Sequence, residues 1–325
     1  MPPGSAGTET PPVLRVSARV PLASNISDSG LALGGGVVWV TGGYDRGVIG
    51  IDVATGKLVR DLQSPHGNIP GGGTAATVAD SVWVAYGVAT DAPDGFDAPP
   101  PPNHQTVYRN GKPTTADLNR ASTTGGLVQF DPSSGRSQRL MLFIDWSPAS
   151  VATTPGAVWL AADGIARINP TSGEVVARLP AFGQLAAGLG SLWVAGDDLV
   201  RIDPNTNQVV ARIDIPTARD IVVGDSDVWI TTEDSVLRVD GATNRVTAAI
   251  AIPDPWGVGV DDGRVWVSGF RNGTLSLIDP KRNVVSATIN LGGTLTDVLA
   301  AGDSAWVAFE PGDSSRSALV RVDVA

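Results

Sequence analysis

The sequence predicts an all-β protein, a seven-bladed β-propeller with four antiparallel strands in each blade. Two repeated markers carry this prediction. A tryptophan in a short hydrophobic run, with a small residue two positions later, recurs at Trp39, Trp83, Trp159, Trp193, Trp229, Trp266 and Trp306. Downstream of each, a hydrophobic alternation ends in Asp or Asn, at Asp52, Asp131, Asn169, Asp203, Asp240, Asp279 and Asp323. Repeats of about 35–40 residues made of short alternating strands are typical of propeller blades.

The clearest repeat covers residues 220–253. It divides into four strands, Ile221-Val-Val-Gly, Val228-Trp-Ile-Thr, Val236-Leu-Arg-Val and Val246-Thr-Ala-Ala-Ile-Ala-Ile. None of these segments has the 3.6-residue period of a helix. We expect the repeated tryptophans to be packing residues between blades. The repeated Asp and Asn side chains precede turns, and we expect them to hydrogen-bond the turn backbone.

The two ends of the chain are predicted to complete one blade together. The sequence stops after Leu319-Val-Arg-Val-Asp323, which corresponds to the third strand of the seventh repeat. Near the start, Arg15-Val-Ser-Ala-Arg-Val-Pro-Leu22 matches the pattern of a fourth strand. Pairing these segments closes the ring and covers an otherwise open strand edge.

The domain organisation follows from the repeats. Residues 1–12, rich in Pro, Gly, Ser and Thr, are predicted to be a flexible linker, and residues 13–325 a single propeller domain. Residues 87–124 are a Pro-rich insertion in blade 2, because 48 positions separate Trp83 from Asp131, against 10 to 17 in the other repeats. We expect the insertion to place a hairpin tip, with His104, Tyr108 and Arg109, over the channel mouth as a lid or docking arm. The alternative is a dispensable loop.

Composition excludes several classes of function. The net charge of −10 and the absence of a Lys/Arg run argue against a nucleic-acid partner. The chain has no cysteine, which excludes disulfides and thiolate metal sites. No apolar stretch is long enough to cross a membrane. The abundance of Ala, Gly, Val and Pro, with arginine in place of lysine, is typical of high-GC, actinobacterial-like bacterial genes. A monomer is expected.

The candidate binding residues are those that break the repeat. The loop entering each first strand and the loop between the second and third strands open on the same face of a propeller. Residues at these positions should ring the channel mouth and include aromatic and charged side chains, as a small-ligand pocket requires. They are Trp146, Gln184, Arg219, Asp220, Trp256, Asp297, Tyr44, Tyr86, Phe270 and Phe309.

The repeats resemble those of a known group of propellers. The runs Ser191-Leu-Trp-Val-Ala and Leu199-Val-Arg-Ile-Asp-Pro-Asn-Thr-Asn-Gln look like YVTN-type and streptogramin-lyase-like repeats, and the resemblance covers roughly residues 13–325. It implies the propeller fold and roles that range from antibiotic lyase to extracytoplasmic ligand-binding or sensor module. Such lyases use His and Glu beside Mg²⁺. Here the only histidines are His66 and His104, and no His-x-Glu pair occurs.

The sequence therefore favours an extracytoplasmic binding or sensor module, secreted or anchored upstream, which engages a small molecule or a protein at the channel mouth. A cytosolic protein with a disordered tail is the alternative location. The rival function is a lyase or hydrolase with a metal-based or carboxylate-based site, and a third is a protein–protein interaction platform. No cofactor is predicted, although Asp28, Asp220 and Asp297 offer the oxygen ligands that a divalent cation prefers.

Overall fold

A computed structural model describes most of the chain. The described residues are 11–22, 30–41, 48–62, 73–78, 81–87, 105–109, 112–114, 125–134, 137–143, 149–313 and 316–325. In some of these segments, including 73–78, 86–87, 105–109 and 112–114, only the backbone is described.

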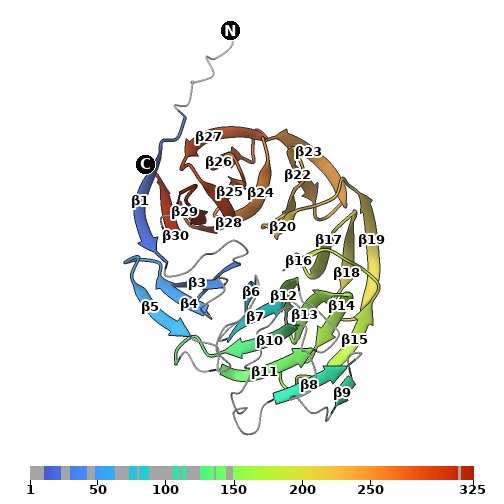
Figure 1. Cartoon of the computed structure of the whole chain (residues 1–325). Coiled ribbons are helices and arrows are strands. Elements are labelled where there is room, and N and C mark those ends of the chain that lie inside the picture. Colours follow the sequence, from blue (N-terminus) through green and yellow to red (C-terminus); the bar gives the residue numbers. More distant parts are fainter. Residues whose placement is uncertain are drawn as a thin grey trace.

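Seven sheets form a ring, as predicted, and each contains four antiparallel strands that make up one blade (Figure 1). Blade 1 contains β2 (Leu31–Gly34), β3 (Val37–Thr41), β4 (Val48–Asp52) and β5 (Leu58–Leu62). Blade 2 contains β6 (Gly73–Val78), β7 (Ser81–Gly87), β10 (Gly125–Phe130) and β11 (Ser137–Phe143). Blade 3 contains β12 (Ser150–Thr154), β13 (Ala157–Ala162), β14 (Gly164–Ile168) and β15 (Val175–Leu179). Blade 4 contains β16 (Gln184–Gly188), β17 (Ser191–Ala195), β18 (Asp198–Asp203) and β19 (Gln208–Asp214).

The remaining blades repeat this order. Blade 5 contains β20 (Asp220–Val223), β21 (Asp227–Thr231), β22 (Ser235–Asp240) and β23 (Arg245–Ala251). Blade 6 contains β24 (Pro255–Asp261), β25 (Arg264–Gly269), β26 (Thr274–Asp279) and β27 (Val284–Asn290). Blade 7 contains β28 (Thr294–Ala301), β29 (Ser304–Glu310), β30 (Ala318–Val324) and, as its outer strand, β1 (Leu14–Pro21).

The predicted closure of the ring is confirmed. Strand β1 pairs antiparallel with β30 from Leu14↔Val324 to Pro21↔Ala318. Two further backbone bonds extend the pairing, from the Leu22 N–H to the Ser317 carbonyl and from the Ala325 N–H to the Val13 carbonyl, both 2.8 Å. The first and last segments of the chain are therefore neighbours in one sheet.

The repeated tryptophans form the core between blades, as expected. All seven are at most 2% exposed. Each packs against the next blade: Trp193 of blade 4, for example, belongs to a cluster with Ile221, Val228 and Ile230 of blade 5. Burying an indole of this size supplies much of the apolar area that holds neighbouring blades together.

Six of the seven repeated Asp and Asn residues hold turns between third and fourth strands, whereas Asp323 accepts hydrogen bonds from Ser304 and Arg321. The Asp240 carboxylate accepts hydrogen bonds from the Thr243 backbone N–H and hydroxyl, both 2.7 Å. Asp52 accepts the same pair from Thr55. These bonds to the turn backbone confirm the structural interpretation of the marker.

The structure also shows a second kind of contact between blades, which was not predicted from the sequence. An arginine on the third strand lies over the tryptophan of its own blade and reaches the next blade. The Arg238 guanidinium lies 5.3 Å from the Trp229 ring centroid and bonds the Asn283 side chain at 3.0 Å. In the same way Arg321 of blade 7 donates to the Val53 carbonyl of blade 1 at 3.0 Å. We call these contacts the arginine clamps.

The insertion in blade 2 contains a hairpin, but the predicted position over the channel mouth is wrong. Strands β8 (Gln105–Arg109) and β9 (Lys112–Thr114) pair antiparallel. Strand β8 then pairs in parallel with β11, the outer strand of blade 2, from Leu140↔Gln105 to Phe143↔Tyr108. The hairpin therefore lies at the outer edge of the ring, where it extends blade 2 to six strands (Figure 1). An open outer strand edge supplies unpaired backbone groups, and the hairpin occupies it.

Candidate functional site

Residues at equivalent positions of neighbouring blades lie at the same level of the channel mouth. Asp220 pairs with Thr231 at the start of β20, and Asp297 pairs with Ala308 in β28. Gly257 takes the corresponding place in β24, at an irregularity between Pro255 and Val258. Arg219 immediately precedes β20, while Trp256 and Thr296 lie within the first residues of β24 and β28.

Asp220 and Asp297 each connect two blades. The Asp220 carboxylate accepts hydrogen bonds from the N–H of Ile221 and from the N–H of Val258 in blade 6, both 2.8 Å. The Asp297 carboxylate accepts bonds from the N–H of Val298 (2.7 Å) and from the N–H of Leu31 in blade 1 (2.8 Å). A hydroxyl does the same work in blade 3, where Ser150 accepts from the Leu185 N–H of blade 4 at 3.0 Å. Both carboxylates therefore stabilise the ring, because they satisfy inner-strand amides that face no neighbouring strand.

Gly257 lies between these two carboxylates and lets blades 6 and 7 approach closely. A Cβ at this position would come within 3.2 Å of the Asp297 Cα and 3.1 Å of the Val298 nitrogen. The backbone of β24 therefore fits between Asp220, which bonds Val258, and Asp297, which packs on Gly257.

Both carboxyl groups have raised pKa values. The groups lie deep in the ring, with only part of their surface accessible. This desolvation raises the pKa of Asp220 to about 6, although the N–H bonds from Val258 and Ile221 oppose the shift. The pKa of Asp297 is also raised, first by desolvation and then by the negative charge of Asp220. The channel side of blades 5 to 7 is thus an acidic region in which ionising both carboxyls is unfavourable.

An aromatic and arginine cluster lies above this region, at the boundary of blades 5 and 6. The Trp256 and Phe270 rings stack with centroids 4.5 Å apart and an interplanar angle of 25°. The Arg219 guanidinium lies 5.5 Å from the Trp256 ring, and the Arg271 guanidinium lies 5.5 Å from the Phe270 ring. We call these four residues the mouth cluster. Stacking and cation–π contacts hold all four side chains in place.

Asp254 organises the mouth cluster. One carboxylate oxygen bonds Arg219 at 2.9 Å, and the other accepts the Arg271 backbone N–H at 3.0 Å. The Arg271 guanidinium is 4.0 Å from the carboxylate and 78% exposed, so it is held much less closely than Arg219. Partial burial raises the pKa of Asp254, but the bonds from Arg271 and Arg219 outweigh it and the pKa falls below its usual value. Asp254 also has a positive φ of 51°, which an Asp tolerates better than most residues.

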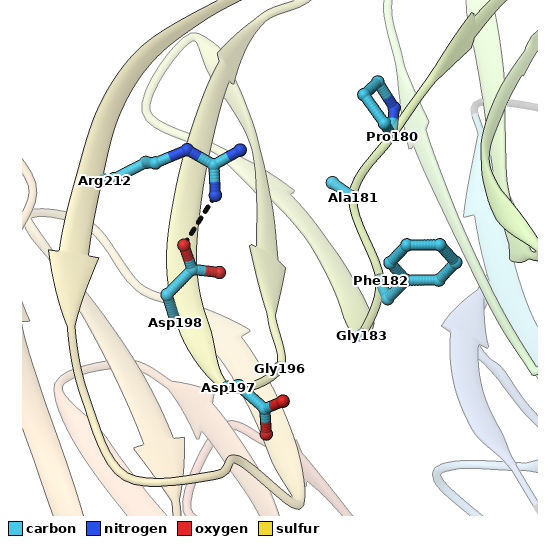
Figure 2. Close-up of a pocket in the computed structure, with 8 residues that line it drawn as sticks. All are labelled: Pro180, Ala181, Phe182, Gly183, Gly196, Asp197, Asp198 and Arg212. Carbon is cyan, nitrogen blue, oxygen red and sulfur yellow. Dashed lines mark hydrogen bonds and ion pairs between the residues drawn. The ribbon is translucent and has the colours of Figure 1, made fainter.

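A separate hollow of about 320 Å³ opens in blade 4. It is lined by Pro180, Ala181, Phe182, Gly183, Gly196, Asp197, Asp198 and Arg212. Figure 2 shows the Arg212–Asp198 ion pair (2.6 Å) on one side and the segment 180–183 on the other, with the Phe182 ring turned away from the ion pair. Phe182 is 65% exposed. Asp197 accepts a bond from Thr217 at 3.0 Å, so the hollow borders the loop that leads to Arg219.

The structure brings some of the predicted site residues together and separates others from them. Arg219, Trp256 and Phe270 come together in the mouth cluster, while Asp220 and Asp297 lie beside Gly257. Gln184 is half-buried at the start of β16. Phe309 is only 4% exposed and packs in the core of blades 6 and 7, with Arg19 over its ring, so we exclude it from the candidate site. Its position near a strand end resembled that of Phe270, but the bulk of blade 7 covers it.

Other predicted residues cannot be placed. Trp146, Tyr44, His104 and Asp28 lie outside the described residues. Tyr86, Tyr108 and Arg109 are described only as strand backbone, in β7 and β8. The prediction missed Asp254 and Phe182. The signal for both was their place in loops that enter first strands, the same class of loop that supplied Arg219.

Two features of the described residues bear on metal binding and membranes. No group of three His, Asp or Glu side chains in this part of the chain could hold a metal ion. Within the same residues, no helix is long and apolar enough to cross a bilayer.

Comparison with known proteins supports the fold. No family model matches the chain, and no curated protein matches it. Among solved structures, BamB from Moraxella catarrhalis is similar over 95% of this chain and 97% of that one, with a TM-score of 0.57 and 12% sequence identity. The similarity is one of fold. At this level of identity, the chemistry of the mouth has to be argued from the residues themselves.

Proposed function

We propose that this protein is a binding propeller that engages a protein partner through the mouth face of blades 4 to 6. The observation that carries the proposal is the exposure of large aromatic rings there. Trp256, near the start of β24, is 37% exposed, and Phe182, in the loop that enters β16, is 65% exposed. All other exposed large hydrophobic residues among those described lie on or beside outer strands: Val13, Val16, Leu58, Val59, Val176, Val209, Val210, Val246, Val284 and Val285.

The composition of the cluster supports a binding role. Tryptophan and arginine are enriched at the energetic centres of protein interfaces, where they combine apolar area with directional donors. Here both are pre-organised, because Phe270 and Asp254 hold them before any partner arrives. A pre-organised surface loses little side-chain entropy on binding.

Photo-cross-linking in cells that make the full-length protein tests the proposal. Trp256 would be replaced by p-benzoylphenylalanine, and a matched variant would carry the same residue at Lys281, an exposed turn position on the opposite face. We expect a discrete protein adduct from position 256, weakened by Arg271→Glu, and none from position 281. Equal adducts from both positions, or adducts from position 281 alone, would contradict a binding site on the mouth face.

We also propose that the protein acts outside the cytoplasm. The support is the linker-like composition of residues 1–12, which suits a tether that holds a folded domain away from a membrane or a preceding segment. Fractionation of cells that express the full-length gene tests this. Recovery of the protein only in the cytosolic fraction would contradict it.

A further inference from the structure

The mouth cluster combines a recognisable anion-binding group with an exposed aromatic surface. Arg219 and Arg271 are two cations with one close carboxylate, Asp254, and that carboxylate is committed mainly to Arg219. The Arg271 guanidinium is 78% exposed and lies 4.0 Å from Asp254, yet its position over the Phe270 ring fixes where it points. It is therefore a pre-positioned cation with donors that its neighbours do not saturate.

The surroundings restrict which anion can bind. The chain as a whole carries a net charge of −10. On the blade 5 side, the exposed residues Glu233 and Asp234 border the cluster, and the Asp234 carbonyl accepts a bond from the Ile252 N–H, two residues before Asp254. A run of acidic residues would meet these carboxylates and be repelled. A single acidic group, placed over Arg271, would not.

The exposed indole supplies the second half of the recognition. Trp256 stacks on Phe270 with one face and lies under Arg219, and 37% of the residue remains accessible. An aromatic side chain beside the acidic one would pack against the part of the indole that remains accessible. Aromatic pairs of this kind add about 0.5–1.5 kcal/mol beyond area burial, which matches a factor of about 2 to 12 in affinity.

We propose that the mouth cluster binds a peptide segment of the partner that carries one acidic residue next to, or a few positions from, an aromatic residue. The carboxylate pairs with Arg271, and the aromatic ring packs on Trp256. This inference rests on the proposed function and names the chemistry of the partner at the same site.

Fluorescence anisotropy with the full chain and defined peptides tests the inference. The probes are fluorescein-labelled dodecapeptides of Gly and Ser that contain one Asp and one Trp at spacings of one to five residues. Matched peptides carry Asn or Lys in place of Asp, or two further Asp residues. We expect the Asp-containing peptides to bind at least about two- to fivefold more tightly than the Asn peptides, the range of one exposed ion pair. The Lys peptides should bind more weakly still, and extra Asp residues should bring no gain.

Protein variants separate the roles of charge and stacking. Arg271→Gln should remove the preference for Asp over Asn, and Arg271→Lys should restore part of it, because the charge returns without the planar group. Arg282→Gln is the control, since Arg282 is also an exposed arginine (57%) but lies on the opposite face. The Arg282→Gln variant should bind every peptide with the affinity of the wild type.

Several outcomes would overturn the inference. They are equal binding of Asp and Lys peptides, a preference that survives Arg271→Gln, or no binding of any Asp peptide at about 1 mM. If position 256 still gives a partner adduct in cells in these cases, the proposed function stands and only the acidic–aromatic chemistry fails. If that adduct is absent as well, both fail.

Discussion

The carboxylate of Asp297 in blade 7 accepts a hydrogen bond from the backbone N–H of Leu31 in blade 1, 2.8 Å away and 266 positions distant in the chain. This bond joins the inner strands of the last and first blades, while the pairing of β1 with β30 joins the two ends of the domain at the outer strands. The same geometry joins blades 5 and 6 through Asp220 and Val258. The mouth of the channel is therefore part of the structural frame as well as a candidate binding surface.

Asp297→Ala should lower the free energy of unfolding by about 1–3 kcal/mol, because it leaves the N–H groups of Leu31 and Val298 without their acceptor. Asp297→Asn keeps one acceptor oxygen and should cost less. Urea unfolding at pH 5, followed by tryptophan fluorescence, measures both. Asp225→Asn, at an exposed position, is the matched control. A loss in Asp297→Ala no larger than in this control would show that the bond contributes nothing.

The protein should be more stable at pH 5 than at pH 7. The pKa of Asp220 is about 6 in the folded chain against 3.8 unfolded, and that of Asp297 is raised as well. The folded state then binds more protons than the unfolded state between about pH 4 and 6, so stability falls as the pH rises through this range. Below about pH 4 it should fall again, because the unfolded state then takes up protons on carboxyls such as Asp131, whose pKa in the folded chain is lowered to about 2 by its turn bonds.

Melting temperatures from pH 3 to 8 measure this profile. Asp220→Asn is the variant that assigns it, since it removes one of the two carboxyls whose pKa is raised and should flatten the change between pH 5 and 7. A profile of Asp220→Asn parallel to that of the wild type would mean that the slope comes from the overall negative charge instead.

Arg238→Ala should destabilise the chain by about 2–3 kcal/mol. It removes an arginine clamp and leaves Asp227, which is 9% exposed, without its ion pair at 2.8 Å. Arg282→Ala, which removes an exposed i,i+3 pair, should change stability by less than about 1 kcal/mol. Chemical unfolding of both variants provides the comparison. Similar losses would mean that the clamp adds no more than a surface ion pair.

Deletion of residues 88–124, with Gly87 joined to Gly125 through Asn-Gly, should leave the seven blades folded. Gly87 and Gly125 already pair across β7 and β10, so a two-residue turn can connect them. We expect an unchanged far-ultraviolet circular dichroism spectrum and a melting temperature within a few degrees of the wild type. Collapse of the fold would show that β8 is needed to cover the edge of β11. Loss of the partner adduct from position 256 in a folded deletion variant would assign partner docking to the insertion.

The repeating parts of the fold were predictable from the sequence. Trp193 and Asp203 recur because each blade needs the same packing and the same turn, so their spacing gave the blade number and the closure by residues 15–22. The arginine clamps were not predicted because an arginine stands opposite the tryptophan in only four blades, at Arg167, Arg201, Arg238 and Arg321. In blade 1, for example, Gly50 lies opposite Trp39, and Arg60 of the fourth strand reaches Ser133 instead.

The candidate site was predictable only in part. The order of strands assigned Arg219 and Trp256 to the mouth face, since that depends on topology alone. The burial of Phe309 depends on how blade 7 packs, and the outer position of the insertion depends on an edge pairing that no local pattern specifies. Asp254 was missed because its role follows from two arginines, one of them 35 positions away.

The hydrogen bond between the Ala325 N–H and the Val13 carbonyl places the two ends of the propeller domain, residues 13 and 325, side by side on the rim. Any segment attached before residue 11 and any segment attached after residue 325 would leave the ring at the same point. A covalent link between these ends would add little strain, and new termini could be opened at an exposed turn such as 281–282. In such circular permutants β30 and β1 would be joined as an ordinary hairpin, and the new chain termini would lie in a different blade.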